Sequence, residues 1–421
     1  MITRELLRII IQEGKEIIRE AELHPRPFEY EPNARYVMVG VRQAGKSYTL
    51  YQIAKALIEE GYELDQFVYL DFDDERLIGM KSDEFDFILQ AYNSSSIKTP
   101  VFFFDEIQNV EGWEHFARRL ANRKFKVYIS GSNAKMLSRE IQTTLGGRYL
   151  EERIFPYSFN EYLNTKGIEL KKDWEYGAQR HDVKRYFDDY CKWGGFPELL
   201  LFKNKRKWLN GLYEKILLND IILRNNVKNE MAIRLTFRRL AESVMTPISY
   251  TRISNLIKAT GYKISVSTVS DYIKYGKEAC FIFSLENYAA KFSERETVKK
   301  HYFVDNGLLN VFMSHGNSPL LENIIAIDLY RKYNNKVYYY HNDFEVDFFL
   351  PDQKLAIQVA YSILTGENIN TLERELAGLD RLSNRFPDTK LQIVTFDEEG
   401  QVESKKGNII EIVPVWKFLL S

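Results

Sequence analysis

Apolar runs and amphipathic stretches alternate between about residues 36 and 129, and this alternation predicts a parallel β-sheet covered by helices. The run Val101–Phe104 contains no polar residue, which is typical of a strand buried on both faces. The order β-α-β-α-β-α-β implies a doubly wound α/β sheet that binds ligands at the carboxyl ends of its strands. The predicted strands are Tyr36–Val39, Phe67–Phe72, Val101–Phe104 and Lys126–Ile129, and the predicted helices lie near Lys46–Glu60, Ser82–Tyr92 and Gly112–Asn122.

An amphipathic helix is predicted ahead of this sheet, over residues 3–23, and Pro25, Pro27 and Pro32 end it before the first strand. We expect its apolar face to pack on the α/β domain of the same chain, and a contact with a partner subunit is the alternative. The residues on that face are Leu7, Ile10, Ile11, Ile17, Ile18 and Ala21.

Residues 156–290 are predicted to be mostly helical. The segment Gly194–Glu198 is a turn by composition. Further on, a Gly-containing turn joins two short helices, which favours a helix-turn-helix followed by a wing strand. Its third helix carries only Lys274 and Lys277 as basic residues, so DNA contact and protein contact both stay open. The predicted elements of this unit are helices Ile233–Val244, Tyr250–Lys258 and Ser267–Lys277 and the strand Phe281–Leu285.

From residue 291 onward strands and helices alternate again. Glu322 on a helix, Asp347 on a strand and Gln358 on the next strand are similar in order to the core of PD-(D/E)XK nucleases. Such a core uses acids or an amide to hold Mg²⁺ and a Lys to activate water. Ala360 stands at the position of that Lys, so we expect no cleavage unless another Lys, for example Lys354, takes its place. The predicted elements are strands Tyr302–Val304, Val337–His341, Val346–Leu350, Leu355–Ala360 and Leu391–Phe396 and helices Pro319–Tyr333 and Thr371–Arg385.

The segment Gly40–Ser47 has the pattern G-x-x-x-x-G-K-[ST], placed between the first strand and the helix after it. The two glycines let the backbone curl so that successive N–H groups face a polyphosphate, and the helix adds the positive end of its dipole. Lys46 would reach the β- and γ-phosphates, and the hydroxyl of Ser47 would ligate magnesium. The predicted nucleotide-binding residues are Gly40, Val41, Arg42, Gln43, Ala44, Gly45, Lys46, Ser47, Tyr48 and Ser132.

Two acids follow the buried strand Val101–Phe104. Asp105 would hold Mg²⁺ together with Ser47, and Glu106 would orient or deprotonate the attacking water. The alternative is that both acids simply end a strand and face solvent. A small-molecule kinase would also carry the loop and an Asp, but it has less use for the adjacent Glu.

Two further positions are candidates for sensing or neutralising the γ-phosphate. After the fourth strand, Ser132 or Asn133 would sit beside that phosphate, unless the segment is a simple turn. Arg148 follows two glycines and would neutralise charge in its own site or in that of a neighbouring copy. A surface ion pair is the alternative for Arg148.

Composition limits the number of domains, the binding partners and the cellular compartment expected for the chain. The 421 residues suggest two to four domains. The net charge of −1 indicates no general electrostatic attraction to nucleic acid or anionic membranes. A basic cluster at Lys203–Lys207 is either a solvated helix face or a local nucleic-acid contact. The two cysteines are far apart, and no apolar run approaches the ~18–20 residues of a membrane span. The chain lacks the pattern of a signal peptide, and we expect a cytoplasmic protein.

Taken together, these motifs resemble those of a family of prokaryotic AAA-type ATPases that carry a carboxyl-terminal half of unknown function. The resemblance implies an AAA-like P-loop domain, a winged helix and a PD-(D/E)XK-nuclease-like end domain, which Ala360 suggests is inactive. The expected divisions are residues 1–34 (helix and linker), 35–155 (AAA-like), 156–212 (helical linker or lid), 213–290 (winged helix) and 291–421 (nuclease-like). The matching segments are Gly40–Ser47, Phe103–Glu106, Ser130–Ser132, Leu145–Arg148, Pro156–Tyr162, Gly194–Glu198, Tyr302–Leu308, Glu345–Phe348 and Gln358–Ser362.

The leading hypothesis is therefore a Mg²⁺-dependent ATPase in which Lys46, Glu106 and Arg148 are catalytic and Ser47 and Asp105 hold the metal. The alternative is a nucleotide-gated switch that binds DNA or protein through its carboxyl-terminal domains with little turnover. A metal-dependent nuclease with an attached motor is a weaker third reading. The sequence is also compatible with a homo-oligomer, and it does not determine whether the bound nucleotide is ATP or GTP.

Overall fold

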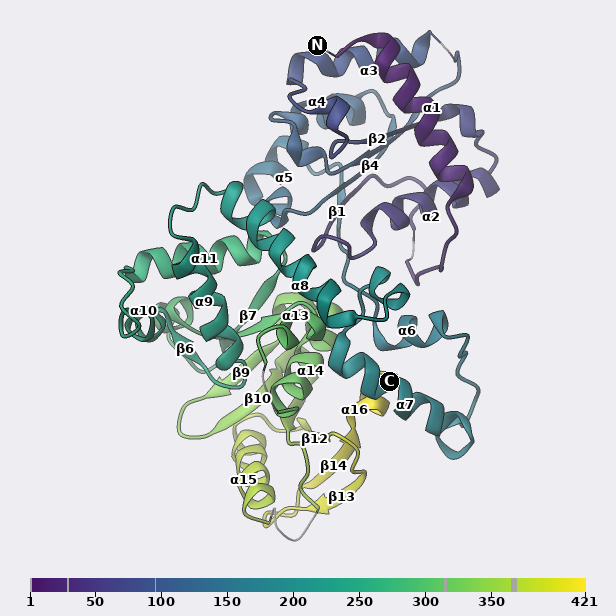
Figure 1. Cartoon of the computed structure of the whole chain (residues 1–421). Helices are drawn as coiled ribbons and strands as arrows, with labels where there is room; N and C mark the ends of the chain where they lie inside the picture. The colour runs from purple at the N-terminus through teal and green to yellow at the C-terminus, as the bar shows by residue number, and fades with distance from the viewer. Residues whose placement is uncertain (1, 29, 95, 314–315, 365–368) are drawn as a thin grey trace. The chain divides into compact units, whose positions relative to one another are not determined.

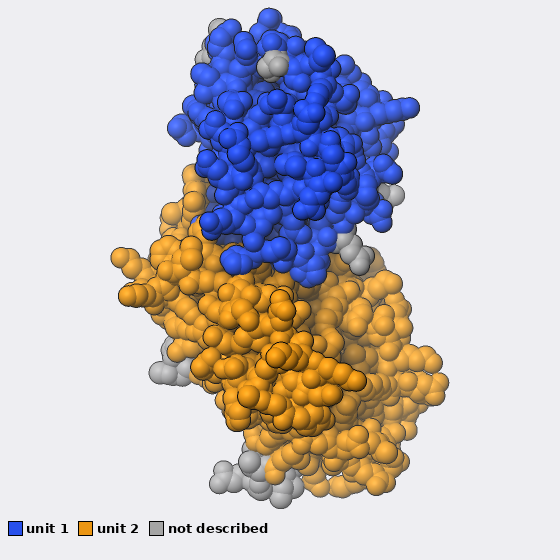
Figure 2. Space-filling model, turned by 90° about the vertical axis from the view of Figure 1, so that its right-hand side faces the viewer, with its two compact units in different colours: residues 1–155, 278–280 blue, residues 156–277, 281–421 orange. Residues whose placement is uncertain are grey.

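The computed structural model of the chain describes residues 2–28, 30–94, 96–313, 316–364 and 369–421. The chain forms two compact units, one of residues 1–155 and 278–280 and the other of residues 156–277 and 281–421 (Figure 2). Each unit is built on its own β-sheet. The finer domain divisions expected from the sequence remain predictions.

The sheet of the first unit is entirely parallel and has the strand order β2-β3-β4-β1-β5. The α/β architecture with a parallel sheet is therefore confirmed, and four of the strands were predicted. The fifth, β5, pairs with β1 at the edge, with Tyr36 opposite Leu150. The strands are β1 Tyr36–Val39, β2 Phe67–Asp71, β3 Val101–Asp105, β4 Lys126–Gly131 and β5 Leu150–Arg153.

The lateral order of the strands decides what meets at the carboxyl edge of this sheet. Strand β4 lies between β3 and β1, so its end separates Asp105 from the loop that follows β1. In the register, Val39 is opposite Gly131 and Phe104 is opposite Ile129. The residues that follow β4 are therefore placed beside both predicted site elements.

Helices of the first unit cover this sheet. The first helix begins at Thr3, whose side chain accepts a hydrogen bond from the backbone N–H of Leu6. It buries Leu7, Ile10 and other apolar residues and contacts α3 and β2 of the same unit. The prediction that it packs on its own α/β domain is thus confirmed. The helices are α1 Arg4–Glu20, α2 Lys46–Glu59, α3 Phe85–Asn93, α4 Trp113–Asn122 and α5 Arg139–Leu145.

The second unit contains a mixed nine-stranded sheet with the order β13-β14-β12-β11-β10-β9-β7-β8-β6. Strand β7, predicted as the wing of the helix-turn-helix, pairs with β8 and also with β9, so one sheet runs through both predicted carboxyl-terminal domains. The strands are β6 Ile248–Ser249, β7 Ile282–Asn287, β8 Val298–Phe303, β9 Tyr338–His341, β10 Glu345–Leu350, β11 Leu355–Val359, β12 Lys390–Thr395, β13 Gly400–Glu403 and β14 Ile409–Pro414.

Helices of the second unit gather at both ends of this sheet (Figure 1). Helices α9, α10 and α11 lie near β6, and α15 lies near β12. Helix α14 is buried on nearly all sides, which explains why its sequence has little amphipathic character. The helices are α6 Phe159–Thr165, α7 Gln179–Trp193, α8 Lys205–Lys215 continuing as a π-helix over Ile216–Leu223, α9 Glu230–Glu242, α10 Tyr250–Lys258, α11 Val266–Glu278, α12 Phe292–Thr297, α13 Asn306–Asn310, α14 Ser318–Tyr333, α15 Ile369–Arg385 and α16 Val415–Phe418.

The turn predicted at Gly194–Glu198 has a packing role. Gly194 has a φ of +79°, and a Cβ added there would lie 1.9 Å from the Oδ1 atom of Asp305. The backbone N–H of Gly195 donates to Oδ2 of the same carboxylate over 2.7 Å. Two segments far apart in the sequence are thereby joined.

Among the described residues, no helix combines the length and apolar character needed to cross a membrane.

Candidate nucleotide-binding site

The predicted phosphate loop connects β1 to α2 in the first unit. Gly45 has a φ of +98°, a left-handed conformation that side chains disfavour. Gly40 is confined differently, because a Cβ there would lie 2.0 Å from the backbone oxygen of Ile154, just after β5. Gln43 also has a positive φ, of 63°. The loop therefore has the tight curl that the glycine spacing predicted.

The amino-terminal end of α2 offers unsatisfied hydrogen-bond donors. The backbone N–H groups of Gly45, Lys46 and Ser47 have no acceptor among the residues that the structure describes. Such groups at a helix start carry partial positive charge and bind anions. Such a helix start is electrostatically suited to an anion.

The side chain of Lys46 is 4% exposed and lies folded over the loop. Its ammonium donates to the backbone oxygens of Gly40 and Val41 over 3.2 and 3.3 Å. It also lies 3.2 Å from the Oε1 atom of Glu106. The structure thus joins the phosphate loop to the acid that the sequence proposed as the catalytic base.

Asp105 ends β3 and is 2% exposed. Its carboxylate accepts hydrogen bonds from the hydroxyls of Ser130 and Tyr69 and, over 3.1 Å, from the N–H of Glu106. Burial and the charge of Glu106 raise the pKa of Asp105, although hydrogen bonds from Ser130 and Ser47 oppose this rise. Ser47 and Asp105 are therefore neighbours, and their oxygens are the kind that Mg²⁺ prefers.

Glu106 has an unusual backbone, with a φ of +49° directly after the strand. Burial by itself would raise the pKa of its carboxyl, but Lys46, a hydrogen bond from Gln108 and the charge of Arg42 lower that pKa to about 2. Glu106 is therefore ionised and held by a cation. The alternative that both acids merely face solvent does not fit these contacts.

Gln108 is a site residue that the sequence reasoning missed. Its Nε2 atom donates to the Oε2 atom of Glu106 over 2.6 Å, and the backbone N–H of Ser132 donates to the same oxygen over 3.1 Å. The Oε1 atom of Gln108 is buried with no partner among the described residues. In the sequence, the position of Gln108 two residues after Glu106 was the one feature that could have indicated its role in the site. Ser132 therefore contacts the predicted base through its backbone.

The remaining predicted residues lie at the edges of this arrangement. Asn133 caps the next helical turn, since its side chain accepts from the N–H of Lys135. Arg42 pairs with Asp73 over 3.0 Å, and Tyr48 is 55% exposed. The exposed Arg148 donates to the backbone oxygen of Gly146, and within the described part of the chain it contacts none of Lys46, Asp105 and Glu106.

The acids of the nuclease-like pattern meet in the second unit, around a lysine that the sequence reasoning did not select. Lys300 of β8 lies 3.2 Å from Glu322 and 2.9 Å from Asp347. Lys354 instead pairs with Asp388 at the surface. Gln358 accepts from the N–H of Asp347 and donates to Glu375 over 2.5 Å, while Ala360 is buried.

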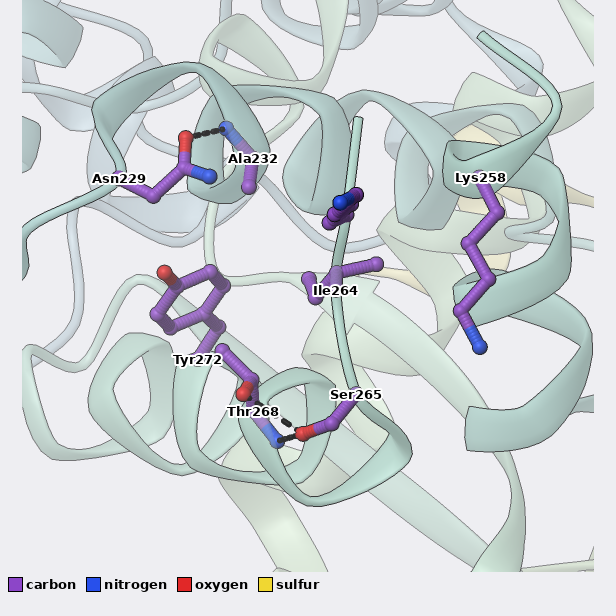
Figure 3. Close-up of a pocket in the computed structure, with 8 residues that line it drawn as sticks. Asn229, Ala232, Lys258, Ile264, Ser265, Thr268 and Tyr272 are labelled. Atoms are coloured by element: carbon purple, nitrogen blue, oxygen red, sulfur yellow. Dashed lines mark hydrogen bonds between the residues drawn. The ribbon is translucent and has the colours of Figure 1, made fainter. Parts of the chain in front are cut away.

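A pocket of about 550 Å³ opens at the helix-turn-helix pattern of the second unit. It is lined by two lysines and by no carboxylate, and Figure 3 shows Asn229, Tyr272 and Thr268 on one side and Lys258 on the other. Tyr272 is 6% exposed, and its hydroxyl has no hydrogen-bond partner among the described residues. The lining residues are Asn229, Ala232, Lys258, Lys263, Ile264, Ser265, Thr268 and Tyr272.

Comparison with known proteins assigns the first unit to a class. The model of the AAA domain family matches residues 33–163, and a domain of unknown function (DUF8612) matches residues 184–318. With the phosphate loop and the parallel sheet, this makes the first unit an AAA-type P-loop ATPase domain, a class that binds ATP. The match to the second unit assigns it no function.

Two relatives extend over most of the chain. The uncharacterized protein MJ1544 of Methanocaldococcus jannaschii is 33% identical over 440 residues, covering 100% of this chain and 97% of that protein. An uncharacterized protein of Haemophilus influenzae is 31% identical over 337 residues, covering 78% of this chain and 82% of that protein. The chain belongs to the family of these proteins.

Among solved structures, the chain is similar to the Walker-type ATPase PABY2304 of Pyrococcus abyssi. The identity is 14%, the match covers 74% of this chain and 96% of that one, and the TM-score is 0.43. A likeness at this level adds nothing to the assignment of either unit.

Proposed function

We propose that the protein is an ATPase that hydrolyses ATP with Mg²⁺ at the phosphate loop of its first unit. The observation that carries this is the row of N–H groups at Gly45, Lys46 and Ser47, which have no acceptor among the described residues, together with the contact of the Lys46 ammonium with Glu106. In this proposal Lys46 binds the β- and γ-phosphates, and Ser47 and Asp105 hold Mg²⁺. When bound, the metal would offset phosphate charge that develops during transfer.

Glu106 is proposed to orient the attacking water and accept its proton. In the structure its carboxylate is paired with the ammonium of Lys46 over 3.2 Å. Because Lys46 also serves the phosphates, ATP binding would draw the ammonium away from Glu106. Losing this cation raises the pKa of Glu106 and makes it a better proton acceptor. Gln108 and the N–H of Ser132 would keep the carboxylate in position meanwhile.

Arg148 is proposed to act on the nucleotide of a neighbouring copy. Its side chain is exposed, and its only described hydrogen bond is to the backbone oxygen of Gly146, so it is available at the surface. An Arg that enters a partner's site stabilises charge on the transferring phosphoryl group. This role requires a homo-oligomer.

Removal of the metal tests the proposed reaction. Phosphate release from ATP by the wild-type protein is expected to fall at least about 100-fold when EDTA replaces Mg²⁺, because the metal contributes several kcal/mol to the transition state. Phosphate release and calorimetric binding of Mg·ATP are the measurements, with GTP in a parallel series. Folded protein that gives no binding heat with Mg·ATP would contradict the proposal.

The pocket at the helix-turn-helix favours a second function, in which the nucleotide state controls binding of duplex DNA. Lys258 and Lys263 have no acidic partner among the described residues, and the hydroxyls of Ser265 and Thr268 stand at the start of α11. Hydrogen-bond donors, cations and a helix start together suit a backbone phosphate. In helix-turn-helix proteins the corresponding helix start approaches the DNA.

The double variant Lys258→Ala/Lys263→Ala tests this second function. It is expected to weaken DNA binding and to reduce the slope of log K against log salt by about 2, one unit for each lost phosphate contact. Fluorescence anisotropy with a labelled duplex at several salt concentrations measures both effects. Lys171→Ala/Lys172→Ala, which removes two exposed lysines outside both basic sites, is the matched control. Equal affinity and slope in the double variant and the wild type would exclude this pocket as a DNA contact.

A further inference from the structure

Three carboxylates and one ammonium form a buried cluster in the second unit. The Nζ atom of Lys300 lies 2.9 Å from Oδ1 of Asp347 and 3.2 Å from Oε1 of both Glu322 and Glu345. The side chain of Lys300 is 0% exposed, whereas those of Glu322, Asp347 and Glu345 are 3, 15 and 39% exposed. The acids come from α14 and β10, and the lysine comes from β8.

The ammonium is fully used in this position. An ammonium has three N–H donors, and three carboxylate oxygens lie within 3.2 Å of it. Lys300 is therefore placed as the counter-ion of these three carboxylates. It cannot serve as the base of a hydrolytic reaction while it holds these contacts.

The surroundings complete the cluster with protein groups. The hydroxyl of Tyr302 donates to Oε1 of Glu322 over 2.7 Å, and the backbone N–H of Val359 donates to Oδ2 of Asp347 over 3.0 Å. The side-chain Nε2 of Gln358, the third residue of the nuclease-like pattern, donates hydrogen bonds to Glu375 and to the backbone oxygen of Glu345. One oxygen each of Glu322 and Glu345 and both oxygens of Asp347 are thus engaged by protein groups.

A divalent metal does not fit this arrangement. Mg²⁺ needs oxygen ligands at about 2.0–2.1 Å around an open centre, but here that centre is held by the ammonium. A second cation beside it would be repelled at close range. Within the described residues, no group of three or more His, Cys, Asp or Glu side chains is arranged to hold a metal ion.

We propose that Lys300 is a built-in substitute for a divalent cation, so that Glu322, Glu345 and Asp347 form a metal-free structural centre. The second unit then keeps the acids of a nuclease-like site but lacks both the metal and the proton acceptor that cleavage needs. The cluster holds α14, β8 and β10 together. It follows that removal of the lysine charge creates a metal site from the acids that remain.

Lys300→Met tests this proposal because methionine has an unbranched side chain only one atom shorter than that of lysine and carries no charge. Without nucleotide, the variant is expected to bind one additional Mn²⁺ per chain by calorimetry, in a saturable manner that the wild type does not show. In EDTA its unfolding midpoint should lie below that of the wild type, because three carboxylates lose their counter-ion. Mn²⁺ should raise this midpoint, since it binds the folded state.

Two controls separate this result from nonspecific effects. Lys299→Met changes the preceding lysine, whose side chain points to the other face of β8 and pairs with Glu286 over 2.9 Å, and it should gain no Mn²⁺ site. The double variant Lys300→Met/Asp347→Asn should lose the gained site. A folded Lys300→Met protein with the Mn²⁺ binding of the wild type would overturn the proposal.

The wild-type protein provides a second test in case the variant does not fold. Its unfolding midpoint without nucleotide is expected to be the same in EDTA and in Mn²⁺, and Asp347→Asn should not alter that insensitivity. A Mn²⁺-dependent rise in the wild type that disappears in Asp347→Asn would show that the acids already bind a metal. That result would refute the role assigned to Lys300.

Discussion

Glu106→Gln is expected to reduce ATP turnover by about 10²–10⁴-fold, the usual contribution of a general base, while Mg·ATP still binds. Glutamine has the same shape as glutamate and retains an oxygen for the hydrogen bond from Gln108, but it takes no proton from water. Because the ion pair with Lys46 is also lost, the ammonium is free for the phosphates. We therefore expect ATP binding to be at least as tight as in the wild type.

Phosphate release at saturating ATP measures the turnover of the Glu106→Gln variant, and calorimetry measures its affinity for Mg·ATP. Glu111→Gln makes the same chemical change at an exposed position five residues later and should leave both quantities unaltered. Hydrolysis at the wild-type rate in Glu106→Gln would show that another group handles the proton.

Lys46→Ala is expected to abolish detectable Mg·ATP binding and also to lower the free energy of unfolding by about 3 kcal/mol. The first effect follows from the loss of the cation in the phosphate cradle. The second follows from the contact between Lys46 and Glu106, whose side chains are 4% and 13% exposed. Removing one partner of such a pair leaves a poorly hydrated charge behind.

The double variant Lys46→Ala/Glu106→Gln distinguishes these two effects. Since the glutamine side chain carries no charge, the double variant should recover most of the lost stability but none of the ATP binding. Urea unfolding gives the free energies of the four proteins in this cycle, and calorimetry gives the binding. A double variant no more stable than Lys46→Ala would mean that the ion pair does not account for the loss.

The strands that the sequence analysis missed have identifiable reasons. Strand β5 has the sequence Leu-Glu-Glu-Arg, whose only apolar residue is Leu150, because it lies at the edge of its sheet where one side needs no burial. Strand β13 lies at the far edge of the second sheet, whereas β14 lies between β13 and β12 and alternates buried with less buried positions, so it has no continuous buried run. The buried strands were predictable because burial on both faces leaves a continuous apolar run.

The helices that the sequence pattern predicted as a helix-turn-helix were also predictable in position. The second helix has the predicted bounds Tyr250–Lys258, and the third helix, Val266–Glu278, differs from its prediction by one residue at each end. Hydrophobic spacing and a Gly-containing turn are local signals. The pattern did not predict the pairing of β7 with β9, through which the strand predicted as a wing belongs to a larger sheet. Strand partners that are distant in the chain leave no such local signal.

The phosphate loop was readable from the chain alone, because its chemistry depends on eight consecutive residues between a strand and a helix. The partners of Glu106 were not, since they depend on β4 lying between β3 and β1. Lys300 is the clearest case: it precedes Glu322 by 22 residues and Asp347 by 47, with no spacing rule to connect them. Only the tertiary arrangement of β8, β10 and α14 brings its ammonium to those acids, and that arrangement is a property of the whole fold rather than of any segment.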